Sequence, residues 1–147
     1  MRLEITQNAK DFVKEIAETE EKCFSEPWSE SAVSEFLSYS YNGALVCLCD
    51  GEFAGYITYT AVCDEVQIAN VATDPSFRRK GVGMYLVEEL KKVAVEKKSA
   101  VIMLEVRAGN IPAISLYEKA GFEKVGVRKN FYKKPDEDAI LMNLVLQ

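Results

Sequence analysis

The chain has 147 residues, of which 48% are hydrophobic and 28% are charged, with a formal net charge of −5. This length and composition predict one folded domain and exclude an intrinsically disordered chain. The first residues are mostly polar and no apolar run approaches the roughly 18–20 residues of a membrane span, so we expect a cytoplasmic protein without a signal peptide. The negative charge argues against direct binding of nucleic acid, because such domains are usually basic.

Histidine is absent from the sequence. This absence excludes Ser–His–Asp and Cys–His nucleophilic catalysis, a histidine general base and zinc sites of the HExxH type. Any acid–base chemistry must therefore use a carboxylate, a Lys or Cys side chain, or the substrate itself. The cysteines show no metal-ligand spacing, so we expect small buried hydrophobic residues in a reducing compartment and no bound metal. They are Cys23, Cys47, Cys49 and Cys63.

The first half of the chain combines one short strand, two helices and three longer strands. Asp50-Gly51 lies between two apolar runs, which predicts a tight hairpin. Asp74-Pro75 ends the last strand, because proline cannot continue a hydrogen-bonded ladder. The expected elements are a strand at 2–6, helices capped by Asn8 and Ser29, and strands at 44–49, 53–63 and 65–73.

The second half alternates helices and strands and closes with a strand pair. Asn110 can cap a helix at its start and Gly121 at its end. The expected elements are a helix at 83–97, a strand at 101–106, a helix after Asn110, and strands at 122–127 and 139–146. A helical crossover makes its flanking strands parallel, whereas hairpins make antiparallel pairs. The order therefore predicts an α/β (α+β) fold with a mixed, twisted sheet of about seven strands and helices on both faces.

A glycine-rich basic loop, Arg78-Arg79-Lys80-Gly81-Val82-Gly83, lies where a strand passes into a helix. Such a loop presents bare backbone N–H groups to an anion. It lacks the Gly-Lys-Ser/Thr of a Walker A loop, and the position three after Gly83 is Leu86, which does not suit a dinucleotide fingerprint. The loop favours a pyrophosphate over NTP or NAD. The alternative, in which Gly81 makes only a turn and Gly83 only a close packing contact, stays open.

Two residues of the second half are candidates for acid–base work. Glu105 shares a strand face with Met103 and Arg107. It can form an ion pair with Arg107, or it can act as a base whose apolar neighbours raise its proton affinity. Tyr117 lies on the inner face of a helix, where it is either a core residue or a phenol that donates a proton at a cleft.

Several of these segments together resemble the GNAT acetyltransferase superfamily. The family's Arg-x-x-Gly-x-Gly pattern is matched by residues 78–83, and the similarity continues on both sides of that loop. The further matching segments are Asn70–Pro75, Asn110, Ala113 and Leu116–Phe122.

Within the superfamily the chain is similar to the RimI-type enzymes, which acetylate the N-terminal alanine of a ribosomal protein. The similarity is carried by Pro27–Ser29, Leu104–Asn110, Arg128–Tyr132 and Glu137–Met142. It implies one GNAT N-acetyltransferase domain over residues 1–147, acetyl-CoA as co-substrate, no metal, and the N-terminus of a protein as acceptor. It also leads us to expect a monomer or weak dimer that binds neither nucleic acid nor membrane.

The resemblance implies roles for individual residues. Glu105 would be the general base and Tyr117 the general acid, and Trp28, Phe131 and Tyr132 would contact the acceptor. Backbone N–H groups around the glycine loop would surround the pyrophosphate, and those of the preceding strand would bind the pantetheine arm. The residues expected to bind the cofactor are Val71, Ala72, Thr73, Arg78, Arg79, Lys80, Gly81, Val82, Gly83, Met84, Asn110 and Tyr117.

The sequence departs from the family pattern at one cofactor residue, and it leaves the acceptor open. Met84 stands where many relatives carry a basic residue, which would loosen one phosphate contact. The same cofactor machinery would serve acetylation of a lysine side chain or a small amine, or a binding module without turnover. The presence of both Glu105 and Tyr117 counts against the last of these functions.

Overall fold

The structure is a computed structural model that describes residues 1–147, and it confirms the predicted order of helices and strands. The strands are β1 (Leu3–Thr6), β2 (Asn42–Cys49), β3 (Glu52–Val62), β4 (Glu65–Thr73), β5 (Val101–Arg107), β6 (Glu123–Tyr132) and β7 (Glu137–Val145). The helices are α1 (Val13–Cys23), α2 (Glu30–Ser38), α3 (Val82–Glu96) and α4 (Ile111–Lys119), with short 3₁₀ turns η1 (Ala9–Phe12) and η2 (Pro75–Phe77). No helix is long and apolar enough to cross a membrane.

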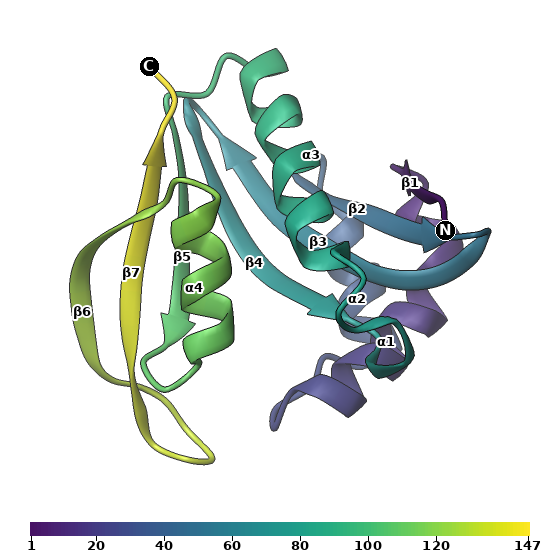
Figure 1. Cartoon of the computed structure of the whole chain (residues 1–147), viewed down its shortest axis with the longest axis horizontal. Helices are drawn as coiled ribbons and strands as arrows, with labels where there is room; N and C mark the ends of the chain where they lie inside the picture. The colour runs from purple at the N-terminus through teal and green to yellow at the C-terminus, as the bar shows by residue number, and fades with distance from the viewer.

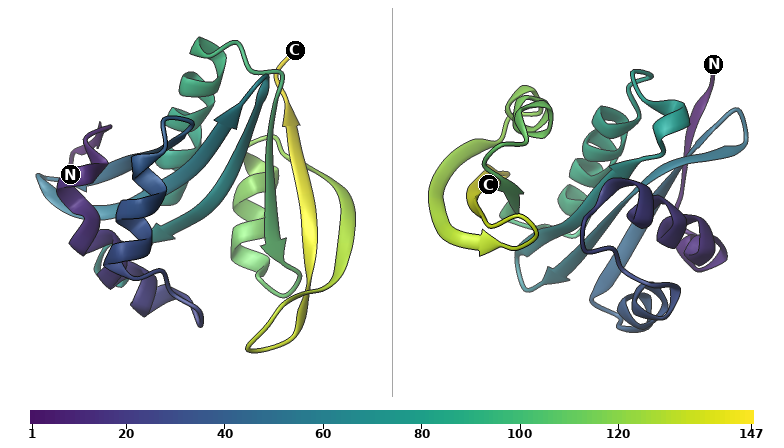
Figure 2. Two further views of the ribbon diagram at one scale, coloured as in Figure 1. Left: turned by 180° about the vertical axis from the view of Figure 1, so that it is seen from behind. Right: turned by 90° about the horizontal axis from the view of Figure 1, so that it is seen from below.

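All seven strands form one mixed sheet in the order β1-β2-β3-β4-β5-β7-β6. Only β4 and β5 pair in parallel, as the crossover through α3 predicts. Helices α3 and α4 cover one face of the sheet (Figure 1), and α1 and α2 cover the other (Figure 2). The predicted fold class is therefore confirmed.

Strand alternation divides the core between these two faces. Leu45 and Cys47 of β2 belong to the larger buried cluster, together with Leu86 of α3. Val46, between them in sequence, belongs to the smaller cluster with Ile16 of α1. Successive side chains of a strand point to opposite faces, so both faces of β2 and β3 must be apolar and both must be covered by helices.

The sheet divides into two arms because β4 and β5 separate. Their pairing runs only from Glu65↔Val101 to Gln67↔Met103, although both strands continue beyond it. Figure 1 shows the two strands meeting at one end and diverging toward the other. A register shift against β3, in which Thr58 faces Asn70 and Tyr59 faces Ile68, leaves Ala69 as an extra residue in β4. Such a bulge bends its strand and ends regular pairing.

The predicted turns and caps are confirmed in most places. Asp50 and Gly51 have φ values of 51° and 85°, which places both in the left-handed region used by tight hairpins. Ser29 accepts a hydrogen bond from the Ala32 amide, as expected of a helix cap. Asn8 does not cap a helix: it precedes η1, and its amide donates to the Asp11 carboxylate at 2.5 Å.

The packing of α3 predicts which of its residues carry stability. Leu86 is 0% exposed, whereas Val95 on the same helix is 61% exposed. Leu86→Ala should lower the free energy of unfolding by about 2–5 kcal/mol, because it removes apolar contacts and leaves a cavity. Val95→Ala should change it by less than about 0.5 kcal/mol. Urea unfolding of both variants measures the difference, and equal losses would contradict the assigned packing.

Candidate active site

The edge of β4 that faces β5 carries backbone groups without a strand partner. The amides of Asn70 and Asp74 point toward β3, where they donate to the Thr58 hydroxyl at 3.0 Å and to the Ala54 carbonyl at 2.8 Å. Backbone direction alternates along a strand, so the amides of Val71 and Thr73 point to the other edge. The separation of β5 leaves that edge open. Of the three β4 residues expected at the cofactor, Ala72 is the one whose amide faces β3.

The glycine loop continues directly from this open edge. None of the backbone amides from Arg78 to Met84 donates a hydrogen bond, and the first intrahelical bond of α3 runs from the Tyr85 amide to Gly81. Gly81 and Arg79 have positive φ values of 79° and 65°. Consecutive unpaired amides at a helix N-terminus form a concave anion site. The predicted cradle is therefore present as backbone geometry.

Gly83 also has a packing reason to be glycine. A Cβ atom there would lie 2.9 Å from the Leu116 methyl group of α4. This approach brings the first turn of α3 against α4, so the close-packing interpretation of Gly83 holds beside the anion-site interpretation. The two interpretations are compatible, because the backbone amide of Gly83 stays free.

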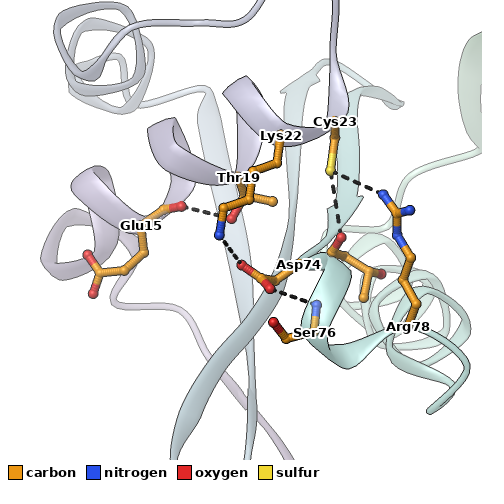
Figure 3. Close-up of polar contacts among 8 residues, drawn as sticks. Glu15, Thr19, Lys22, Cys23, Asp74, Ser76 and Arg78 are labelled. Atoms are coloured by element: carbon orange, nitrogen blue, oxygen red, sulfur yellow. Dashed lines mark hydrogen bonds and ion pairs between the residues drawn. The ribbon is translucent and has the colours of Figure 1, made fainter.

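The C-terminal end of α1 is fastened to the junction between β4 and the loop (Figure 3). Lys22 pairs with Asp74 at 3.2 Å, and the Ser76 amide donates to the same carboxylate at 2.9 Å. The Cys23 thiol lies 3.7 Å from both the Thr73 carbonyl and the Arg78 guanidinium. The Arg78 side chain therefore extends toward α1, which leaves the backbone amides and the exposed Arg79 and Lys80 side chains of the loop for an anion.

Asp74 is stabilised in its charged form. Burial raises the pKa of this carboxyl, but the Ser76 hydrogen bonds and the Lys22 ammonium outweigh it and hold the pKa below its ordinary value. The Asp74 carboxylate thus joins α1 to η2 at the end of β4.

Glu105 lies on the face of β5 opposite to α4. The alternating residues Ile102, Leu104 and Val106 are buried in the α4 cluster, which places Glu105 on the α1–α2 face. Its ion partner is Arg128 of β6, at 3.8 Å. The expected alternative pair with Arg107 is not formed, because Arg107 pairs with Glu137 of β7 at 3.1 Å.

Tyr117 lies on α4, which covers the other face of the sheet. It is 8% exposed and packs edge-on against Phe122, with ring centroids 5.7 Å apart. Its hydroxyl makes no hydrogen bond, yet no buried side-chain oxygen or nitrogen lacks a partner. The hydroxyl is therefore the part of Tyr117 that reaches solvent, while the ring is buried.

Tyr132 of β6 is electrostatically coupled to both candidates. Burial, then the charges of Glu105 and Glu137 against that of Arg107, raise the pKa of Tyr132 to about 12. Burial, then the neighbouring Tyr132, raise the pKa of Tyr117. The Arg107 guanidinium covers the Tyr132 ring at 4.5 Å from its centroid. Tyr132 thus senses the charge of Glu105, and Tyr117 senses Tyr132; both phenols stay protonated at neutral pH.

One of the two polar atoms in the Asn110 side chain already makes a hydrogen bond. Its oxygen accepts from the Ala113 amide at 3.2 Å and so caps α4, as predicted. Its nitrogen donates no hydrogen bond within the chain and is free to bind a ligand.

The expected acceptor residues lie in two separate parts of the chain, before α2 and on the β6–β7 hairpin. Trp28 precedes α2, packs on Phe36 at 5.1 Å and borders two surface hollows of about 390 and 340 Å³. Phe131 is 42% exposed on the β6–β7 hairpin, next to Tyr132.

The sequence analysis missed Glu20, which is 0% exposed on α1 and accepts hydrogen bonds from Trp28, Tyr56 and Asn70. A glutamate in a charged helix gives no sign of such burial.

Comparisons with known proteins identify the family of the chain. The chain matches the family described as "Acetyltransferase (GNAT) family" over residues 13–122. A Bacillus subtilis protein provisionally named a [ribosomal protein bS18]-alanine N-acetyltransferase is 37% identical over 131 residues, which cover 88% of this chain and 87% of that protein. The Escherichia coli K12 [ribosomal protein bS18]-alanine N-acetyltransferase is 35% identical over 127 residues, or 85% of each protein.

The same similarity holds in three dimensions. The crystal structure of the ribosomal-protein-S18-alanine N-acetyltransferase from Escherichia coli matches with a TM-score of 0.89 and 31% identity, covering 99% of this chain and 95% of that one. The family match and these relatives thus define an acetyltransferase. The chain belongs to the GNAT acetyltransferase family and is an acetyl-CoA-dependent N-acetyltransferase.

The Asp74 contacts predict a specific dependence of stability on pH. A carboxyl whose pKa is lowered by folding adds stability above its unfolded value near 3.8, and this stability is lost as pH falls through the folded value. Wild type should therefore exceed Asp74→Asn in thermal midpoint at pH 7, and the difference should shrink below about pH 4. Asp136→Asn on the exposed hairpin turn changes the net charge equally and serves as control. A wild-type advantage that stays constant down to pH 2 would contradict the assignment.

Proposed function

We propose that this enzyme transfers the acetyl group of acetyl-CoA to the α-amine of a protein, with the N-terminal alanine of a ribosomal protein as the favoured acceptor. The observation that carries the proposal is the open β4 edge, which leads into the free amides of residues 78–84 and lies opposite β5, the strand that carries Glu105. The names of the relatives at 35–37% identity supply the acceptor class.

The cofactor would lie along backbone already free to receive it. The amides of residues 79–84 would bind the pyrophosphate, aided by the positive end of α3. Val71 and Thr73 would pair with the pantetheine amides as an added strand does, taking the place that β5 vacates. The free nitrogen of Asn110 would donate to the cofactor arm from the other side of the opening.

The chemistry follows from the protonation states of the acceptor amine, Glu105 and Tyr117. An α-amine has a pKa of roughly 7.7–8 and is mostly protonated at neutral pH, so it must lose a proton before its nitrogen attacks the thioester carbon. Glu105 would accept that proton, directly or through water. A β4 amide would polarise the thioester carbonyl. As the carbon–sulfur bond breaks, Tyr117 would donate its proton to the departing sulfur.

The charge distribution supports a basic acceptor. Residues 13–38, which form α1, α2 and their connection, contain seven acidic and two basic residues, for a net charge of −5. The whole chain has the same net charge of −5, so the remainder sums to zero. The surface bordered by Trp28 therefore favours cationic segments.

Peptide acetylation tests the acceptor class. We expect α-acetylation of an Ala-starting, Arg-rich ribosomal peptide in the presence of acetyl-CoA, measured by mass spectrometry. The same peptide with a blocked N-terminus and an internal lysine is the control. Preference for the blocked peptide would assign the enzyme to lysine acetylation, and binding of acetyl-CoA without transfer to any amine would indicate a module without turnover.

Two substitutions test the catalytic roles. Glu105→Gln and Tyr117→Phe should each lower kcat by roughly 10²–10⁴-fold, because each removes one proton transfer. Tyr59→Phe is a matched control, since Tyr59 is also 8% exposed and its hydroxyl lies against Gly43 of β2, and it should leave kcat nearly unchanged. Unaltered rates for either test variant would remove that residue from the mechanism.

The glycine loop can also be tested by a gain of affinity. Met84 is the third residue of α3 and lies within the run of free amides. Met84→Arg should lower the Kd for CoA roughly 3–10-fold at low salt, because it adds a charge-assisted hydrogen bond. Raising the salt concentration should reduce the gain. Calorimetry with CoA measures both effects, and weaker binding by the variant would place the pyrophosphate elsewhere.

A further inference from the structure

Glu20 is a buried carboxylate without a cationic partner. It is 0% exposed, and no Lys or Arg lies within ion-pair distance of it. The nearby Lys22 is directed to Asp74 instead. A buried charge is costly unless its hydrogen-bonding capacity is satisfied, and an apolar side chain would fill the same core position without that cost.

The carboxylate is satisfied by three neutral donors from three different elements. Oε1 accepts from the backbone amide of Trp28 at 3.0 Å. Oε2 accepts from the Asn70 side chain at 2.9 Å and from the Tyr56 hydroxyl. Glu20 therefore joins the α1–α2 connection to β4 and β3.

The Trp28 contact is the main polar restraint on the α1–α2 connection. Residues 25–28 make no other hydrogen bond with the chain. Trp28 lines both surface hollows. Packing on Phe36 also holds the ring, but the only polar contact that fixes Trp28 relative to the sheet is with one Glu20 oxygen.

The β4 end of the network adjoins the open edge. The bulge at Ala69 reverses the faces of β4, so that Asn70 points toward Glu20 while Val71 packs on the opposite face. Asn70 immediately precedes Val71, whose amide faces the opening. The Glu20 carboxylate thus contacts both β4, through Asn70, and the α1–α2 connection, through Trp28.

We infer that Glu20 is a positioning residue that sets the distance between Trp28 and the β4 edge, and thereby aligns the acceptor with the acetyl donor. The inference rests on the proposed function in that the acceptor is taken to pass Trp28. Glu20 itself contacts neither substrate.

The first test uses the unaltered chain. Amide hydrogen exchange measured by NMR should show the Trp28 amide exchanging at least roughly tenfold more slowly than those of Ser25 and Glu26, which donate no hydrogen bond. Equal exchange at the three positions would overturn the inference, whatever the behaviour of any variant.

The second test uses Glu20→Gln, which keeps the side-chain shape but leaves one acceptor oxygen for three donors. Trp28 is the one tryptophan of the chain, so fluorescence reports on it directly. We expect more acrylamide quenching and a roughly 5–30-fold higher KM for the acceptor peptide, with the KM for acetyl-CoA changed less than about twofold. An equal rise in both KM values, or no change in quenching, would contradict a positioning role.

Tyr56→Phe is the matched control, because it removes a donor from Oε2 and leaves the Trp28 bond to Oε1. Its quenching should equal that of wild type, and a rise equal to that of Glu20→Gln would show general loosening of the core instead. If wild type acetylates no peptide, the proposed function fails, while exchange and quenching still decide whether Glu20 holds Trp28.

Discussion

The separation of β4 from β5 is the constraint on which the rest of the structure depends. Three residue pairs join these strands, and beyond Gln67↔Met103 the sheet has an internal edge. Unpaired edges are normally a liability that proteins cover or twist away. Here the edge lies inside the molecule between two arms, where an extended ligand can complete the ladder. The free amides of the glycine loop continue from this edge, and the strand on its other side carries Glu105.

The opening persists because each arm is stabilised independently of it. The arm of β1–β4 is packed on both faces, by α1 and α2 on one side and by α3 on the other. The arm of β5–β7 is covered by α4, and its hairpin carries the Arg107–Glu137 and Arg128–Glu105 ion pairs. The close approach of Gly83 to Leu116 joins the arms on the cofactor side. A ligand at the opening therefore meets walls whose shape does not depend on its presence.

Local chemistry made much of this predictable from the sequence. The Asp50-Gly51 hairpin, the Ser29 and Asn110 caps and the glycine-loop helix start depend on neighbouring residues, and each was confirmed. The partner of Glu105 was not predictable, because Arg128 is brought to it by the β6–β7 pairing, while Arg107, two residues away, turns to Glu137. The Ala69 bulge and the burial of Glu20 were also missed, since both arise from contacts between distant segments. The roles of Glu105 and Tyr117 stay predictions that the proposed substitutions address.

The concentration of negative charge in residues 13–38 has a consequence for the approach of a partner. A molecule whose excess charge lies on one side produces a field that orients a charged partner before contact. Because the remainder of the chain sums to zero charge, a basic protein would be drawn toward the α1–α2 side, next to the opening, with little competing attraction elsewhere. The encounter rate would then fall with ionic strength even where the affinity of the final complex depends on apolar contacts. The acidic residues of this segment would thus affect how a basic partner is oriented when it first meets the enzyme, in addition to how it is held once bound.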